Sequence, residues 1–174
     1  MFKIIVCLLV VFLFVYAESS VIKTGQTIEY KVGDNGTYHT LTGIERSYSR
    51  DDAKGIVTDN ATGLEWQDYY VAGTIYRADW KAAITYCTQL ELEGSGWRLP
   101  SRKDLKTIVD YSHAQPAIDT MFFHNTASGT YWSSTSYMER SPKNAWRTNF
   151  NDGGDYINEK SRIHFVRCVR GIRK

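Results

Sequence analysis

The 174-residue sequence has only three prolines, and it contains no proline-rich or glycine/serine-rich stretch and no internal repeat. These absences exclude a linker between domains and a repeat architecture. Apolar residues run without interruption only from Ile4 to Val15, about a dozen residues, whereas a helix that spans a bilayer needs roughly 20. The chain is therefore expected to form one ordinary domain with a real core.

Motifs of several enzyme classes are also missing. There is no G-x-S-x-G nucleophile motif, no H-E-x-x-H zinc motif and no glycine-rich phosphate-binding loop. The four histidines, which show no spacing typical of metal ligands, are His39, His113, His124 and His164. We therefore expect a protein that binds a ligand rather than an enzyme, with no metal and no cofactor.

The apolar run at the start follows a lysine and is itself followed by polar residues from Glu18 onward. This order is typical of a secretory signal peptide, and Val15 and Ala17 supply the small residues that a signal peptidase site requires. We expect residues 1–17 to be a signal peptide and residues 18–174 to be a single mature domain. The mature protein would be periplasmic or extracellular in a bacterium, and cleavage would leave no membrane anchor.

Cysteine is scarce, with three residues in the whole chain. Cleavage removes Cys7 and leaves Cys87 and Cys168. Because an even count in an oxidising compartment favours pairing, we predict a disulfide between these two, the alternative being two separate buried thiols. A bridge across about 80 residues would stabilise the fold by roughly 4 kcal/mol.

Positive charge is concentrated at the end of the chain. Residues 140–174 hold 9 Lys/Arg against 3 Asp/Glu, whereas residues 18–139 hold 11 against 16. Either the two parts neutralise each other within the domain, or the basic part binds a glycan or another polyanion. The candidate ligand-binding residues are Arg140, Lys143, Arg147, Asn149 and Asp152. We expect no nucleic-acid partner, and the oligomeric state stays open.

Residue periodicity predicts two helices among short strands. The first lies between Asp79 and Gly94 and places Cys87 on its apolar stripe, and the second runs from Ser101, a capping-box residue, to about Asp110. Residues 43–57 look like a loop. Strands or hairpins are expected at 28–41, 56–67, 131–137, 145–150 and 156–157, and a central strand at 163–169. On the strand at 145–150, Arg147 and Asn149 would share a face that reaches solvent.

Several motifs occur together in an order typical of one family. They are residues 58–67 (TDNATGLEWQ), Trp80 with Ala83 and Tyr86-Cys87, Trp97-Arg98-Leu99-Pro100-Ser101, Leu105, Tyr131-Trp132-Ser133-Ser134, Ala145-Trp146, and Val166-Arg167-Cys168-Val169-Arg170. From about Gly25 to Arg170 the chain resembles the C-terminal domain of the Legionella collagen-like adhesin, the Lcl C-terminal domain family.

The resemblance implies an α+β, C-type-lectin-like fold, with two helices against a small antiparallel sheet and long loops. It also implies structural roles for the motif residues Trp66, Trp97, Arg98, Pro100, Trp132 and Trp146. The chain lacks the adhesin's Gly-X-Y stalk. The adhesin engages glycosaminoglycans, which suggests a ligand class.

Calcium-dependent sugar binding is not expected, because the motif Gln115-Pro116-Ala117 offers too few oxygen ligands. Two other functions remain as alternatives: a periplasmic enzyme acting on cell-wall or glycan substrates, and a structural component of the envelope. A deep pocket with several carboxylates would favour the enzyme, whereas a shallow basic or aromatic face would favour the binding module.

Overall fold

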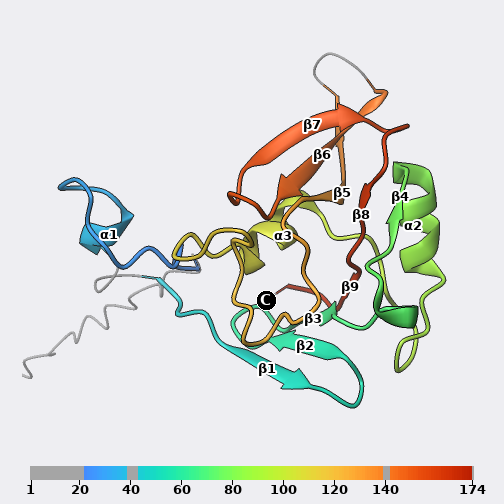
Figure 1. The fold of residues 1–174 in the computed structure, drawn as a ribbon, viewed down its shortest axis with the longest axis horizontal. Coiled ribbons are helices and arrows are strands. Elements are labelled where there is room, and N and C mark those ends of the chain that lie inside the picture. The colour runs from blue at the N-terminus through green and yellow to red at the C-terminus, as the bar shows by residue number, and fades with distance from the viewer. Residues whose placement is uncertain (1–21, 39–42, 139–141, 174) are drawn as a thin grey trace, which may run out of the picture.

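The computed structural model describes residues 22–38, 43–138 and 142–173. These residues form a mixed α+β fold, as expected (Figure 1). The helices are α1 (Asn35–Tyr38), α2 (Trp80–Thr88) and α3 (Arg102–Ile108), with a 3-10 turn at Val71–Gly73. The strands are β1 (Tyr48–Asp51), β2 (Ile56–Asp59), β3 (Leu64–Gln67), β4 (Arg77–Ala78), β5 (Thr130–Tyr137), β6 (Asn144–Asn149), β7 (Asp155–Glu159), β8 (His164–Phe165) and β9 (Val169–Arg170).

The strands build two sheets rather than the one small sheet expected. One sheet has the order β1-β2-β3-β9 and is antiparallel throughout. The other has the order β4-β8-β5-β6-β7, and its β5–β8 pair is parallel. In Figure 1 the first sheet lies below and the second above, and α3 lies between them while α2 flanks β4. The segment from β8 to β9 passes from one sheet to the other.

Both predicted helices are present, and local capping explains where they start. Asp79 accepts a hydrogen bond from the Ala82 N–H and so caps α2. Ser101 and Asp104 form the expected capping box at the start of α3, because each side chain accepts from the other residue's backbone N–H. Across the described residues, no helix has the length and apolar character needed to cross a membrane.

The predicted disulfide between Cys87 and Cys168 is confirmed, with the two Cα atoms 5.4 Å apart. It fastens α2 to the chain just before β9, inside a buried cluster that includes Trp97 and Trp132. A second cluster packs α3 through Leu105 against the β1-β2-β3-β9 sheet. The two helices therefore pack into different buried clusters, α2 with the disulfide and α3 against the β1-β2-β3-β9 sheet.

Three local predictions were wrong. Residues 28–34 form no strand: Ile28 and Val32 are 61% and 84% exposed, and Asp34 accepts hydrogen bonds from the N–H groups of Tyr30, Lys31 and Thr37 instead of leaving them for a ladder. A single helical turn, α1, follows, and residues 39–42 lie outside the described residues. The supposed loop at 43–57 contains β1, an edge strand whose polar sequence YSRD gave no apolar signal.

The third concerns the end of the chain, where one central strand was expected over residues 163–169. The structure has two short strands there, β8 and β9, in different sheets. Between them the Cys168 N–H donates to the Gln67 side-chain oxygen, and the Arg167 side chain is buried. Side-chain bonds replace the ladder at this point, so the strand breaks.

Candidate functional site

The motif tryptophans are largely core residues. Trp66 and Trp132 are fully buried and Trp97 nearly so. The indole N–H of Trp97 donates to the Leu92 carbonyl at 2.9 Å, and that of Trp132 to the Ala78 carbonyl at 3.1 Å. These three rings hold the fold together and offer no face to a ligand.

Other motif residues connect the helices to the sheet. The Ser134 N–H donates to the Pro100 carbonyl at 2.7 Å, and the Trp80 indole donates to the Ser133 carbonyl at 2.8 Å. An irregularity in the β5–β6 pairing between Trp132 and Ser136 frees these backbone groups from the ladder. The Tyr-Trp-Ser-Ser motif thus fixes α2 and the start of α3 to the second sheet.

The charged motif residues also serve the fold. Arg98 pairs with Asp104 at 2.8 Å, and Trp146 is half-buried with the guanidinium carbon of Arg102 4.3 Å from its ring centre. The Arg167 side chain is completely buried and pairs with the equally buried Asp68 at 3.0 Å. A buried pair of this kind is very sensitive to loss of one partner.

The predicted basic segment is only partly accessible. Arg140 lies outside the described residues, and Lys143 is exposed. Arg147, on β6, is half-buried, and its guanidinium carbon lies 5.6 Å from the ring centre of the exposed Tyr156. Desolvation lowers the pKa of Arg147, and its Nε atom is buried without a hydrogen-bond partner among the described residues. The expectation that this side chain reaches solvent freely was therefore wrong.

Asn149 and Asp152 are used by the turn between β6 and β7. The Asn149 side-chain oxygen accepts from the Asn151 N–H at 3.0 Å. Asp152 accepts from the Gly154 N–H at 2.8 Å and from the Tyr156 hydroxyl at 2.9 Å. Both side chains thereby shape the turn, and Asp152 places a negative charge close to Tyr156.

His164 lies on the same face of the sheet as Arg147. Its ring packs against the Trp132 ring and is at hydrogen-bond distance from Thr130 (2.6 Å) and Asn158 (3.1 Å). Desolvation, reinforced by the positive charge of Arg147, lowers the pKa of His164 to about 4. The ring is therefore neutral near pH 7, and it adds no cation to the surface around Arg147.

A stronger concentration of positive charge lies elsewhere, in a cavity of about 530 Å³. The lining brings together five segments that are far apart in sequence: Ile22, Ile44, Ala61, Thr62, Lys103, Lys106, Thr107 and Arg173. Three of these residues are cations and none is a carboxylate. Backbone pairing between Ile22 and Ile44 builds one wall.

The three cations of this cavity differ in their surroundings. Lys106 donates to the Gly153 carbonyl at 2.8 Å and lies 3.9 Å from the Asp155 carboxylate. Lys103 and Arg173 are exposed, and within the described ranges neither has a carboxylate at ion-pairing distance. Sequence reasoning missed this site, because nothing in the pattern indicates that Arg173 returns to α3.

The expected neutralisation within the domain does occur for part of the basic end. Arg167 pairs with Asp68, and Arg170 pairs with Glu65 on β3. Arg173, three residues later, is left facing the cavity. Of these three arginines, Arg167 and Arg170 stabilise the fold, whereas Arg173 lines the cavity.

A second cavity, of about 420 Å³, lies along α2 and has a different chemistry. It is lined by Tyr76, Asp79, Lys81, Ala82, Thr85, Tyr86 and Gln89. Each of the two cavities has at most one carboxylate in its lining. In the part of the chain that the structure describes, no three His, Cys, Asp or Glu side chains gather as metal ligands would.

Comparison with protein families places most of this architecture in one family. The model of the Lcl C-terminal domain matches residues 55–170, from just before β2 to the end of β9. The match begins later than the resemblance from Gly25 implied, and it ends at the same residue. No curated protein matches the sequence. The chain belongs to the Lcl C-terminal domain family.

Proposed function

We propose that this protein is an exported binding module that recognises an acidic glycan or another polyanionic polymer. The observation that carries the proposal is the cavity lined by Lys103, Lys106 and Arg173 without a carboxylate. Export is supported by the predicted signal peptide and by the disulfide, which is typical of oxidising compartments. A C-type-lectin-like arrangement is proposed with it, supported by the family resemblance.

Three like charges around one concavity repel each other, and a bound anion would relieve that repulsion. A concave wall also focuses the field, which raises the local concentration of anions. Lys103 and Arg173 have no competing ion pair within the described residues, so binding a sulfate or carboxylate there costs no existing salt bridge. Because both side chains are exposed, the attraction is screened by salt over about 8–10 Å at physiological ionic strength.

The alternative of an enzyme on cell-wall or glycan substrates finds less support. Paired carboxylates that cleave glycosidic bonds must face each other across a site. The basic cavity has none in its lining, and the cavity along α2 has only Asp79. Both linings therefore favour ligand binding over glycoside cleavage as the proposal.

The test compares two variants with equal loss of charge. Lys103→Ala/Arg173→Ala removes the two cations of the cavity that have no ion pair among the described residues, and the control Lys54→Ala/Arg162→Ala removes two exposed cations from elsewhere. We expect the first to weaken binding to heparin about tenfold at low salt, because a charge contact at an exposed site is worth about 0.7 kcal/mol and the two together about 1.4 kcal/mol. Equal binding by both variants, or binding indifferent to salt, would refute the proposal.

A second variant tests the face predicted from the sequence. Arg140→Ala/Lys143→Ala/Arg147→Ala leaves the cavity lining intact while removing the three cations that were predicted from the sequence. If this variant loses heparin binding and the cavity variant does not, the polymer binds along β6 and β7 instead. Neutral dextran serves as the control polymer for both.

A further inference from the structure

The cavity along α2 contains two tyrosines in an ordered stack. The ring centres of Tyr76 and Tyr86 are 4.2 Å apart and their planes differ by 18°. Tyr86 is half-buried, whereas Tyr76 is 37% exposed and forms part of the cavity lining. The stack therefore presents aromatic surface to solvent next to the helix.

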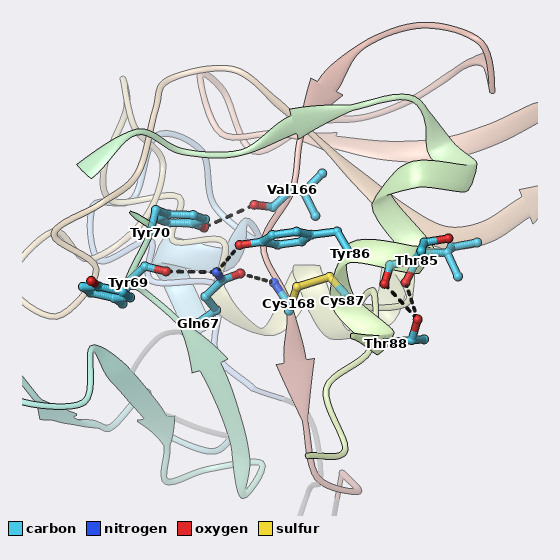
Figure 2. Close-up of a disulfide and its surroundings, with 10 residues drawn as sticks. Gln67, Tyr69, Tyr70, Thr85, Tyr86, Cys87, Thr88, Val166 and Cys168 are labelled. Carbon is cyan, nitrogen blue, oxygen red and sulfur yellow. Dashed lines mark hydrogen bonds between the residues drawn. A yellow bond between two sulfur atoms is a disulfide. The ribbon is translucent and has the colours of Figure 1, made fainter. Parts of the chain in front are cut away.

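The inner ring is held in place by a buried amide. The Gln67 Nε2 group donates to the Tyr86 hydroxyl at 2.8 Å and to the Tyr69 carbonyl at 2.9 Å, while its oxygen accepts from the Cys168 N–H at 3.2 Å. Figure 2 shows the Gln67 amide hydrogen-bonded to both Tyr86 and Cys168, with the disulfide beside Cys168. Tyr86 also precedes Cys87 in α2, so the disulfide fixes the chain on both sides of this contact.

A rigid aromatic platform of this kind favours binding because little conformational freedom is lost when a ligand stacks on it. Here the amide and the disulfide position the inner ring, and the inner ring positions the outer one.

The polar groups around the platform suit a ligand with hydroxyl groups. Asp79 uses Oδ1 to cap α2, and its Oδ2 makes no hydrogen bond within the described residues. The exposed Gln89 amide, which offers both a donor and an acceptor, lies at another part of the lining. One carboxylate and one lysine, Lys81, leave the lining without the excess of positive charge found in the other cavity.

From this combination we infer that the cavity along α2 is a binding site for an uncharged oligosaccharide, with one pyranose stacked on Tyr76 and hydroxyls of the saccharide bonded to Asp79 and Gln89 at the two ends of the helix. The apolar C–H face of a pyranose matches an aromatic ring, and its hydroxyls donate to a carboxylate and exchange bonds with an amide. A volume of about 420 Å³ accommodates a saccharide unit. The site shares no lining residue with the basic cavity, so the inference is independent of the proposed function.

The experiment is an NMR titration of the purified protein with three neutral hexasaccharides: cellohexaose, maltohexaose and chitohexaose. At least one should give saturable shifts of the Thr85 and Gln89 amides. Tyr76→Phe keeps the ring and should bind within about twofold of the parent, whereas Tyr76→Ala should bind about tenfold more weakly, equivalent to about 1.4 kcal/mol.

Two further variants separate the sites and guard against a folding defect. Gln89→Ala changes an exposed side chain and should also weaken sugar binding, whereas Lys103→Ala/Arg173→Ala should leave it unchanged. Shifts by none of the three sugars, or equal affinity of the Tyr76→Ala and Tyr76→Phe variants, would overturn the inference. Failure of the parent protein to bind heparin would count against the proposed function and leave this site unaffected.

Discussion

Replacing both cysteines should lower the free energy of unfolding more than any other double substitution that leaves the large core side chains in place. The bridge closes a loop between residues separated by 81 positions, and both cysteines are fully buried. Loop-closure entropy for this separation corresponds to about 4.5 kcal/mol at 25 °C. Single domains unfold with about 5–15 kcal/mol, so the loss takes a large part of the total.

The variant is Cys87→Ala/Cys168→Ala, measured by urea unfolding followed by far-UV circular dichroism. Its free energy of unfolding should fall by about 4–5 kcal/mol, and its melting temperature by roughly 10–18 °C for a domain of this size. The m-value should rise, because the unfolded chain without its cross-link exposes more surface.

The parent protein treated with a reductant under unfolding conditions is the control, since it loses the cross-link but keeps both side chains. Agreement between the reduced parent and the variant would attribute the loss to the cross-link rather than to the missing sulfur atoms. A loss below about 1 kcal/mol with an unchanged m-value would refute the loop-closure argument.

Three other predictions follow from particular residues. His164 should titrate with a pKa of about 4 by NMR. Because this pKa lies below that of the unfolded chain, the stability that His164 contributes near pH 7 should decline as the pH falls from about 6.5 to 4. Arg147→Gln should raise the pKa of His164, and an unshifted pKa would contradict the burial argument. Asp68→Asn should destabilise the fold by about 3–5 kcal/mol because it leaves the Arg167 charge buried, and a loss no larger than that of an average surface substitution would argue against it. N-terminal sequencing of the secreted protein should read from Glu18, and retention of the apolar segment would contradict the signal-peptide prediction.

Local signals in the sequence were sufficient for much of the fold. Both helices were predicted because their caps, Asp79 and Ser101, lie directly before apolar stripes of helical period. The disulfide followed from the count of cysteines left in an exported chain, which needs no knowledge of geometry. In each case the physical cause acts over a few residues or on composition alone.

Segments whose structure depends on distant partners were not predicted. The alternating residues 28–32 form no strand, because their apolar side chains stay exposed and Asp34 takes the local N–H groups. Residues 163–169 are apolar enough for one strand, yet they are divided between two sheets by bonds to Gln67 and Asp68, about a hundred positions earlier. Strand pairing is set by such long-range contacts, and the alternation of side chains does not record them.

The candidate sites, too, were predictable from the sequence only in part. From sequence alone the basic end of the chain was evident. Only the tertiary structure decided which cations are used internally, as Arg167 and Arg170 are, and which one faces a cavity with Lys103. Likewise, the stacking of Tyr76 on Tyr86 depends on how α2 is fixed to the chain before β9. Composition fixes how many charges and rings a chain carries, but whether they are buried, paired or exposed depends on contacts between segments that only folding brings together.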